Sequence, residues 1–175
     1  MIAEPSFGAG SIMPPEEYLP QIRLLTRELG IVWIVDEVLT GFGRMGEWFG
    51  HQLYDVEPDI MTMAKDSAVS MAAVCANIEH MIENDLVDQS KKAGEYFGRK
   101  LRELEEKHKC IGQVAGSGML WNVEIVKDKE TGERFAPEDR YTTYSGDLSN
   151  YPEESMDKAI DALDYALTEL DKYAK

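Results

Sequence analysis

The sequence predicts an α/β fold that contains a parallel β-sheet. Residues 14–29 have the features of a helix, and residues 31–36, IVWIVD, follow at once as a strand that is apolar up to its last residue. A second apolar run, IMTMA at residues 60–64, is predicted to be another strand. Strands without polar alternation are typical of parallel sheets, whose two faces are both covered. A helix followed by such a strand is half of a βαβ unit.

The first predicted helix has recognisable signals at both ends. The prolines at 14–15 suit a helix start and the glutamates at 16–17 suit a first turn. Pro20 lies inside the pattern, so the regular helix begins only there or is kinked. Gly30 is a suitable residue just beyond the C-terminus. Apolar residues recur at helical spacing between these ends: Ile22, Leu25 and Leu29.

Residues 40–50, TGFGRMGEWFG, are predicted to form a turn-rich connection rather than a phosphate-binding loop, because neither G-x-G-x-x-G nor a Walker pattern is present. Helices are predicted at residues 69–83 and 85–108. The second has one apolar face: Gly94, Phe97, Leu101, Leu104 and His108.

The C-terminal part continues with a turn at residues 116–118 and a strand, MLWNVEIV, at 119–126. Residues 128–152 are polar and are predicted to be a loop. A last helix begins at about Glu153, with a stripe of apolar residues: Met156, Ile160, Leu163, Leu167 and Leu170.

Composition excludes several classes of protein. The formal net charge of −15, from 18 basic and 33 acidic residues, disfavours nucleic-acid binding. No apolar run reaches the length of a membrane span, and the N-terminus lacks the pattern of a signal peptide. Cys75 and Cys110 are isolated, which indicates reduced thiols and a cytoplasmic protein. The three histidines lack metal-site spacing and are predicted at the surface or its boundary: His51, His80 and His108.

Two charged residues are predicted at strand ends. Asp36 ends one strand and Lys65 follows another, and ligands of open α/β sheets lie beyond the carboxyl ends of strands. An aspartate and a lysine so placed suit pyridoxal 5'-phosphate (PLP): the lysine forms a Schiff base and the aspartate pairs with the protonated pyridine nitrogen. Val38 lies two residues beyond Asp36, on the same side of an extended chain, and would pack on the ring. Spacing alone leaves open that both charges are solvated strand ends or salt-bridge partners.

A denser pattern surrounds these residues. The sequence EPSFGAGSIMPP, then DEVLTGFGRMG at 36–46, then PDIMTMAK at 58–65, resembles class III aminotransferases, which are PLP enzymes of fold-type I. The resemblance implies that Asp36 contacts the pyridine nitrogen, Val38 packs on the ring face and Lys65 is the catalytic Schiff-base lysine. The wording around GAGSIMPPEEYLPQIR is most similar to the branch that moves an amino group from an amine or ω-amino acid to a keto acid such as pyruvate.

The resemblance continues through VSMAAVCANIEHMIEND and QVAGSGMLWNVEIV. It implies a partial large, PLP-binding domain at residues 1–68, and a linking helix with part of the C-terminal small domain at 69–175. It also implies a homodimer or higher self-association, because the family builds its sites across two subunits.

The sequence departs from the family pattern in several places. The segment that cradles the PLP phosphate is absent, because the chain starts as if in the middle of the fold, and the stretch that follows A-K-G in the family is missing after Lys65. Ala115 replaces an arginine, and Leu39 replaces a glutamine of some members. The sequence around Arg140 matches no segment of the family pattern. Glu37 receives no role. Two interpretations therefore stand: a PLP-dependent aminotransferase, or a non-catalytic α/β scaffold or oligomerising remnant of one.

Overall fold

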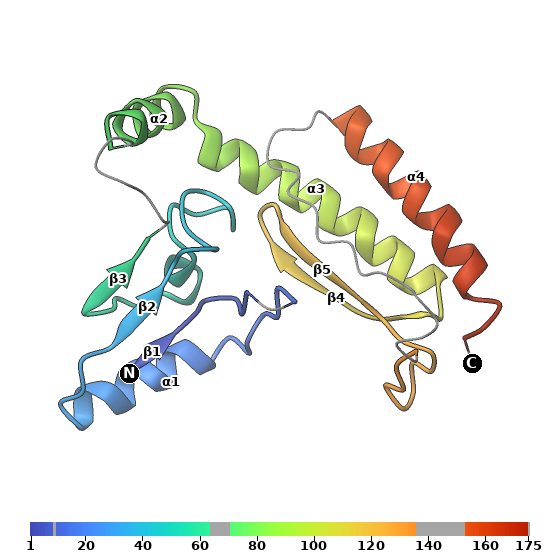
Figure 1. Ribbon diagram of the computed structural model, residues 1–175, viewed down its shortest axis with the longest axis horizontal. Coiled ribbons are helices and arrows are strands. Elements are labelled where there is room, and N and C mark those ends of the chain that lie inside the picture. Colours follow the sequence, from blue (N-terminus) through green and yellow to red (C-terminus); the bar gives the residue numbers. More distant parts are fainter. Residues whose placement is uncertain (9, 64–70, 136–152, 175) are drawn as a thin grey trace.

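The computed structural model describes residues 1–8, 10–63, 71–135 and 153–174, and it contains two separate sheets. The order of elements is β1 (Ile2–Ala3), α1 (Tyr18–Glu28), β2 (Ile34–Asp36), a 3₁₀ helix (Gly50–Tyr54), β3 (Ile60–Thr62), α2 (Met71–Glu83), α3 (Leu86–Lys107), β4 (Ile111–Ser117), β5 (Leu120–Ile125) and α4 (Glu153–Leu170). The parallel sheet β1-β2-β3 and the antiparallel hairpin β4-β5 lie at opposite ends of the molecule, and α2 and α3 connect them (Figure 1).

The predicted parallel sheet is confirmed, but its strands are shorter than expected. The chain pairs in parallel over only three residues of β2, where the pattern predicted six, and the two-residue β1 was missed. Val35 packs beneath the sheet with residues of α1 and the segment before β2, in a core formed by Ala3, Leu19, Ile22, Trp33 and Val35. On the opposite face, Ile2 and Ile60 are 59% and 49% exposed. The expectation of strands covered on both faces is therefore wrong for the described residues.

Helix α1 begins at Tyr18, four residues later than the predicted start. Pro20 falls in its first turn, where a missing N–H costs nothing because no carbonyl is there to accept it. Gly30 adopts φ +64°, and the amide of Ile31 donates to the carbonyl of Thr26 at 2.8 Å, so the predicted C-terminal glycine is confirmed. Leu25 and Leu29, expected on the buried face with Ile22, are exposed.

The second unit packs α3 and α4 with the β4-β5 hairpin. The predicted apolar face of α3 is confirmed, since all five of its residues are buried. The stripe of α4 is also confirmed, with Met156, Ile160 and Leu167 buried. Strand β4 was missed, because its glycines at 112 and 116 weaken the strand pattern. Gly116 has the ring of Trp121 so close that a Cβ would lie 2.7 Å from it, which explains why glycine is required there.

His108 is buried, at 3% exposure, so its predicted place at the surface is wrong. Its Nε2 lies 2.6 Å from Asp164 Oδ1 and its Nδ1 lies 2.8 Å from Asp171 Oδ2. Lys107 adds a contact of 2.6 Å to Asp164. These contacts hold α4 against the end of α3, and they provide polar partners to a ring that burial alone would leave without any.

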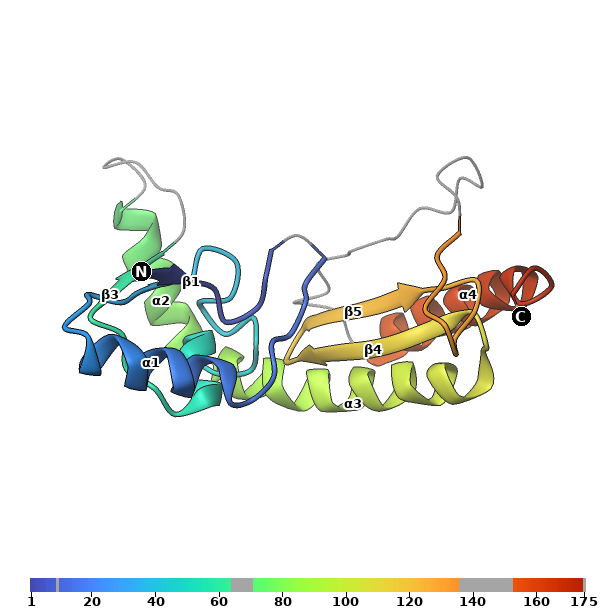
Figure 2. The ribbon, with the colours of Figure 1, turned by 90° about the horizontal axis from the view of Figure 1, so that it is seen from below.

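The loop at residues 40–50 joins the two units. Its carbonyl groups accept hydrogen bonds from the second unit: Ser90 Oγ donates to Gly43 O at 2.7 Å, and the amide of Met119 donates to Arg44 O at 2.8 Å. Gly94 of α3 and Gly118 of the hairpin meet so closely that a Cβ on Gly94 would lie 1.9 Å from the Gly118 carbonyl. Figure 2 shows this loop between the sheet and the N-terminal part of α3.

Two further expectations concern the whole chain. Within the part of the chain that the structure describes, no helix is long and apolar enough to cross a membrane, and no group of His, Cys, Asp and Glu is arranged to hold a metal ion. Cys75 and Cys110 are free thiols, as predicted.

Candidate functional site

The candidate site lies at the carboxyl end of β2. Asp36 is the last residue of this central strand and is half-buried. Its Oδ1 accepts a hydrogen bond of 3.0 Å from the amide of Val38. No other described residue is seen to engage this carboxylate, so a negative charge stands at the edge of a parallel sheet where ligands of such folds bind.

Thr62 is the parallel partner of Asp36 on β3. Its Oγ1 is buried and has no hydrogen-bond partner among the described residues. A buried hydroxyl without a partner costs free energy, so Thr62 is an unusual residue at this end of the sheet. No sequence motif indicates a role for Thr62, and its register opposite Asp36 is what singles it out.

Val38 lies where the chain has already left the strand. Val38 was expected to point to the same side as Asp36 along an extended chain. The chain is not extended there, because β2 ends at Asp36 and Val38 belongs to a turn. The side chain is nevertheless available to a ligand, since Val38 is 38% exposed. Its packing on a ring therefore stays a prediction.

Lys65 lies outside the described residues. The last described residue before it is Met63, immediately after β3. Parallel pairing of β2 with β3 brings the carboxyl ends of these strands to one edge of the sheet. The meeting of Lys65 with Asp36 stays a prediction that this pairing favours.

Glu37, which sequence reasoning left without a role, is fully buried beside the site, at 1% exposure. Its carboxylate accepts hydrogen bonds from the amides of Gly50 and His51, at 2.9 and 2.8 Å, and lies 3.0 Å from His51 Nδ1. Thr40 Oγ1 donates to the same carboxylate. Asp36 and Glu37 are adjacent in sequence but differ in environment, because one faces an open edge and the other is enclosed by donors.

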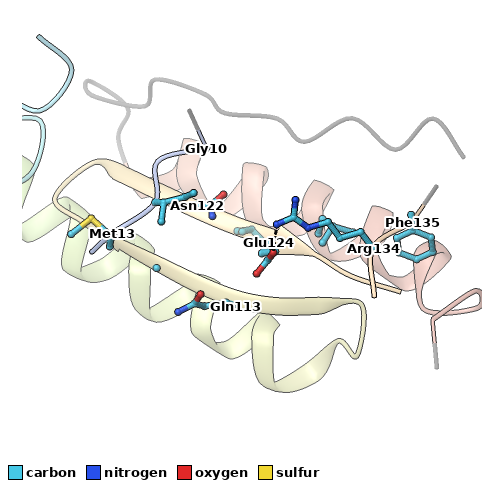
Figure 3. Close-up of a pocket in the computed structure, with 11 residues that line it drawn as sticks. Gly10, Met13, Gln113, Asn122, Glu124, Arg134 and Phe135 are labelled. Atoms are coloured by element: carbon cyan, nitrogen blue, oxygen red, sulfur yellow. Dashed lines mark hydrogen bonds and ion pairs between the residues drawn. The ribbon is translucent and has the colours of Figure 1, made fainter. Parts of the chain in front are cut away.

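A pocket of about 530 Å³ lies elsewhere, between residues 10–13 and the β4-β5 hairpin (Figure 3). Two of its charged groups neutralise each other, since Arg134 and Glu124 form an ion pair of 3.0 Å. Ala115, which replaces the arginine of the family pattern, contributes to its wall. Neither Asp36 nor Val38 lines this pocket, so it is separate from the candidate site.

The parallel sheet with a carboxylate at the end of its central strand defines an α/β protein whose candidate site lies at the carboxyl edge of the sheet. The family model described as aminotransferase class-III matches residues 1–69. The chain belongs to this family, and its α/β fold corresponds to part of the fold-type I transaminase fold. Members of the family use PLP.

Individual relatives differ in their chemistry. The chain is 34% identical to a leucine/methionine racemase of Thermococcus litoralis, over 77% of this chain and 38% of the relative. It is 33% identical to a putrescine–pyruvate aminotransferase of Pseudomonas aeruginosa, over 77% of this chain and 37% of the relative. Its structure resembles that of an S-selective transaminase from Arthrobacter sp., with a TM-score of 0.86 and 40% identity, over 98% of this chain and 51% of the other.

These comparisons also set the extent of the chain. It spans less than two fifths of the length of these two curated relatives and about half of the solved structure. The matched part includes the candidate site, because residues 1–69 contain Asp36, Val38 and Lys65.

Proposed function

We propose that this chain carries the ring-binding part of a PLP-dependent aminotransferase site. The observation that supports the proposal most is the half-buried carboxylate of Asp36 at the carboxyl end of β2, in register with Thr62, whose hydroxyl has no partner among the described residues. The described residues fit the ring of PLP, since they offer an anion for the pyridinium nitrogen and the exposed apolar side chain of Val38.

Each residue has a distinct task in this proposal. Asp36 binds the protonated pyridine nitrogen and keeps its proton in place, because an opposite charge favours the charged form. Val38 covers the ring face, and Lys65 binds the cofactor covalently and carries a proton as general base and then acid. When bound, PLP supplies an electron sink for the carbanion that forms at the substrate.

We propose an amine or ω-amino acid as amino donor and a keto acid such as pyruvate as acceptor. The putrescine–pyruvate aminotransferase among the relatives supports this choice, while the racemase relative shows that related chains serve other reactions. Two organisational proposals accompany it: a partial PLP-binding domain at residues 1–68 and a small-domain part at 69–175. The separate cores of residues 3–35 and 97–174 support this boundary. A homodimer and a cytoplasmic location stay predictions.

A non-catalytic scaffold is the second candidate. The observation that favours it is the length of the match, since the chain spans about half of the solved transaminase. The phosphate of PLP needs charge-assisted hydrogen bonds, each worth about 1.5–3 kcal/mol, and the departures from the family pattern predict that these residues supply few of them. A chain that folds and self-associates without holding PLP would serve this alternative.

Borohydride trapping separates the two candidates. The purified chain is incubated with PLP, reduced with borohydride, digested and mapped by mass spectrometry. The proposal predicts a reduced PLP adduct on Lys65 at near-stoichiometric yield and its loss in Lys65→Ala. Labelling spread over exposed lysines such as Lys92 and Lys158, equal in both proteins, would count against a site and favour the scaffold. Amino transfer to pyruvate, measured as alanine formed, then tests the reaction.

A further inference from the structure

Glu37 is a buried carboxylate to which the proposed chemistry assigns no task. Three groups donate hydrogen bonds to it: Thr40 Oγ1 and the amides of Gly50 and His51. His51 Nδ1 lies 3.0 Å from the same carboxylate. The carboxylate oxygens are therefore occupied by the protein itself, so Glu37 is not a free acid or base for a substrate.

The donors come from both ends of one loop. Thr40 lies three residues beyond Glu37, whereas Gly50 and His51 lie thirteen and fourteen residues beyond it. The carboxylate therefore closes the loop at residues 40–50 onto the end of β2. Close packing supports this closure, because a Cβ on Gly50 would lie 2.9 Å from both Pro5 and Met45.

The same closure controls the backbone that carries the candidate site. The amide of Glu37 donates to Thr62 O at 2.9 Å, and its carbonyl accepts from the amide of Gly41 at 3.0 Å. Val38 stands between these two fixed points, and its amide donates to Asp36 Oδ1 at 3.0 Å. A shift of the turn at residues 37–41 would move the Val38 amide, and the carboxylate of Asp36 would lose the donor that the described residues provide to it.

We infer that Glu37 is a positioning residue for Asp36. Its enclosed carboxylate fixes the turn at residues 37–41, and this turn orients the Asp36 carboxylate and presents Val38 to a ligand. The inference rests on the proposed function only for the identity of that ligand. The bracing itself belongs to the chain without any cofactor.

Single-amide hydrogen exchange by NMR tests the inference on the cofactor-free chain. In Glu37→Gln, an amide group replaces one carboxylate oxygen and points N–H groups at donors. We expect exchange at Gly50, His51 and Val38 to accelerate about tenfold or more, because hydrogen bonds to a charged acceptor are lost. Glu47→Gln is the matched control, since Glu47 lies in the same loop but pairs with Lys91 at the surface. It should leave all three rates unchanged.

The exchange rates distinguish a residue that only holds the loop from one that also orients Asp36. If Gly50 and His51 exchange faster in Glu37→Gln while Val38 keeps its wild-type rate, Glu37 holds the loop without orienting Asp36, and the inference fails. Should Glu37→Gln not fold, Thr40→Val removes one donor only, and a rise of about twofold or more at Val38 is expected. An unchanged Val38 rate there would overturn the inference.

A second readout concerns the ligand. The dissociation constant for PLP, from the visible absorbance of the bound form, should rise about tenfold in Glu37→Gln and stay unchanged in Glu47→Gln. A wild-type chain that binds no PLP would refute the proposed function, whereas the exchange rates would still decide the role of Glu37.

Discussion

The two units of this molecule are held together in different ways. Among the described residues, the unit of α3, β4, β5 and α4 has an apolar core of eleven buried residues, whereas the parallel-sheet unit has a core of five. The sheet unit also exposes many large apolar side chains: Met1, Ile2, Ile12, Leu24, Leu25, Leu29, Ile31, Val32, Ile60 and Met63. The unit that carries the candidate site is therefore the one whose apolar surface is less well covered.

Carboxylates that accept several hydrogen bonds compensate in the sheet unit. Arg23 pairs with both oxygens of Asp59 at 2.9 Å, and Asp59 Oδ2 also accepts from the Trp33 amide at 2.8 Å. The hydrogen bonds from Arg23 lower the pKa of Asp59 to about 2. Glu37 closes the loop in a similar way. Directional contacts to charge thus position the site where apolar burial is limited.

The largest expected effect on stability is that of replacing a buried leucine, compared with an exposed one. Leu101, 2% exposed on α3, lies in the larger core, and Leu25, 51% exposed, lies on α1. Leu101→Ala should lower the free energy of unfolding by about 2–5 kcal/mol, because it leaves a cavity. Leu25→Ala should change it by about 0.5 kcal/mol or less. Urea unfolding followed by circular dichroism measures both. Equal losses would show that α1 is covered by something in solution.

The packing of α3 against the β4-β5 hairpin, within the second unit, gives the next effect. Gly94→Ala should cost about 1–3 kcal/mol, because the new methyl group meets the Gly118 carbonyl and forces the hairpin away from α3. Lys92→Ala, at an exposed position on the same helix, is the control. Thermal unfolding of the two variants gives the comparison, and a Gly94→Ala variant as stable as Lys92→Ala would mean that this approach is not close.

Acid should weaken both units through different carboxylates. The pKa values of Asp59, in the sheet unit, and of Asp164 and Asp171, beside His108, are all lowered. Hydrogen bonds from Arg23 cause the shift of Asp59, and those from Lys107 and then His108 cause that of Asp164. Burial by itself would raise the pKa of Asp171, but hydrogen bonds from His108 and Cys110 outweigh it and lower this pKa.

A lowered folded pKa means that stability is present above the unfolded value of about 4 and is lost as the pH falls through the folded value. Stability should therefore decline below about pH 4, and for Asp59 this decline extends to a pH of about 2. Asp59→Asn should flatten the profile of melting temperature against pH in this window. A variant profile parallel to that of the wild type would show that the Arg23 pair contributes nothing to stability.

The smallest effect on stability concerns the exposed side of α1. Leu24→Lys combined with Leu29→Lys should change the free energy of unfolding by about 0.5 kcal/mol or less, since both leucines are exposed. The same change should reduce self-association, because exposed apolar patches favour it. Sedimentation velocity measures the latter. Association that persists unchanged in this variant would assign it to another surface.

The sequence predicted most of the second unit and less of the first, for physical reasons. The stripes of α3 and α4 were predicted correctly, because a helix that buries one face must repeat apolar residues along it. The IVWIVD run was read as a strand covered on both faces, but only three of its residues pair and one face of the sheet is open. An apolar segment is able to be buried, but its sequence does not show whether other residues are present to cover it.

The candidate site was predicted in part. Asp36 lies at a strand end as expected, since a parallel strand after an apolar run ends where polarity begins. Thr62 and Glu37 were missed, because their importance comes from register and from donors up to fourteen residues away. His108 was placed at the surface because its partners, Asp164 and Asp171, belong to a distant helix.

The charge of Asp36 is the centre of this account, and the affinity for PLP tests it most directly. Asp36→Asn keeps the shape of the side chain and removes its charge. Asp55→Asn is the matched control, because Asp55 is exposed and has φ +49°, a conformation that asparagine tolerates. The dissociation constant for PLP should be about tenfold or more above wild type for Asp36→Asn and unchanged for Asp55→Asn. Wild-type affinity in Asp36→Asn would contradict this account.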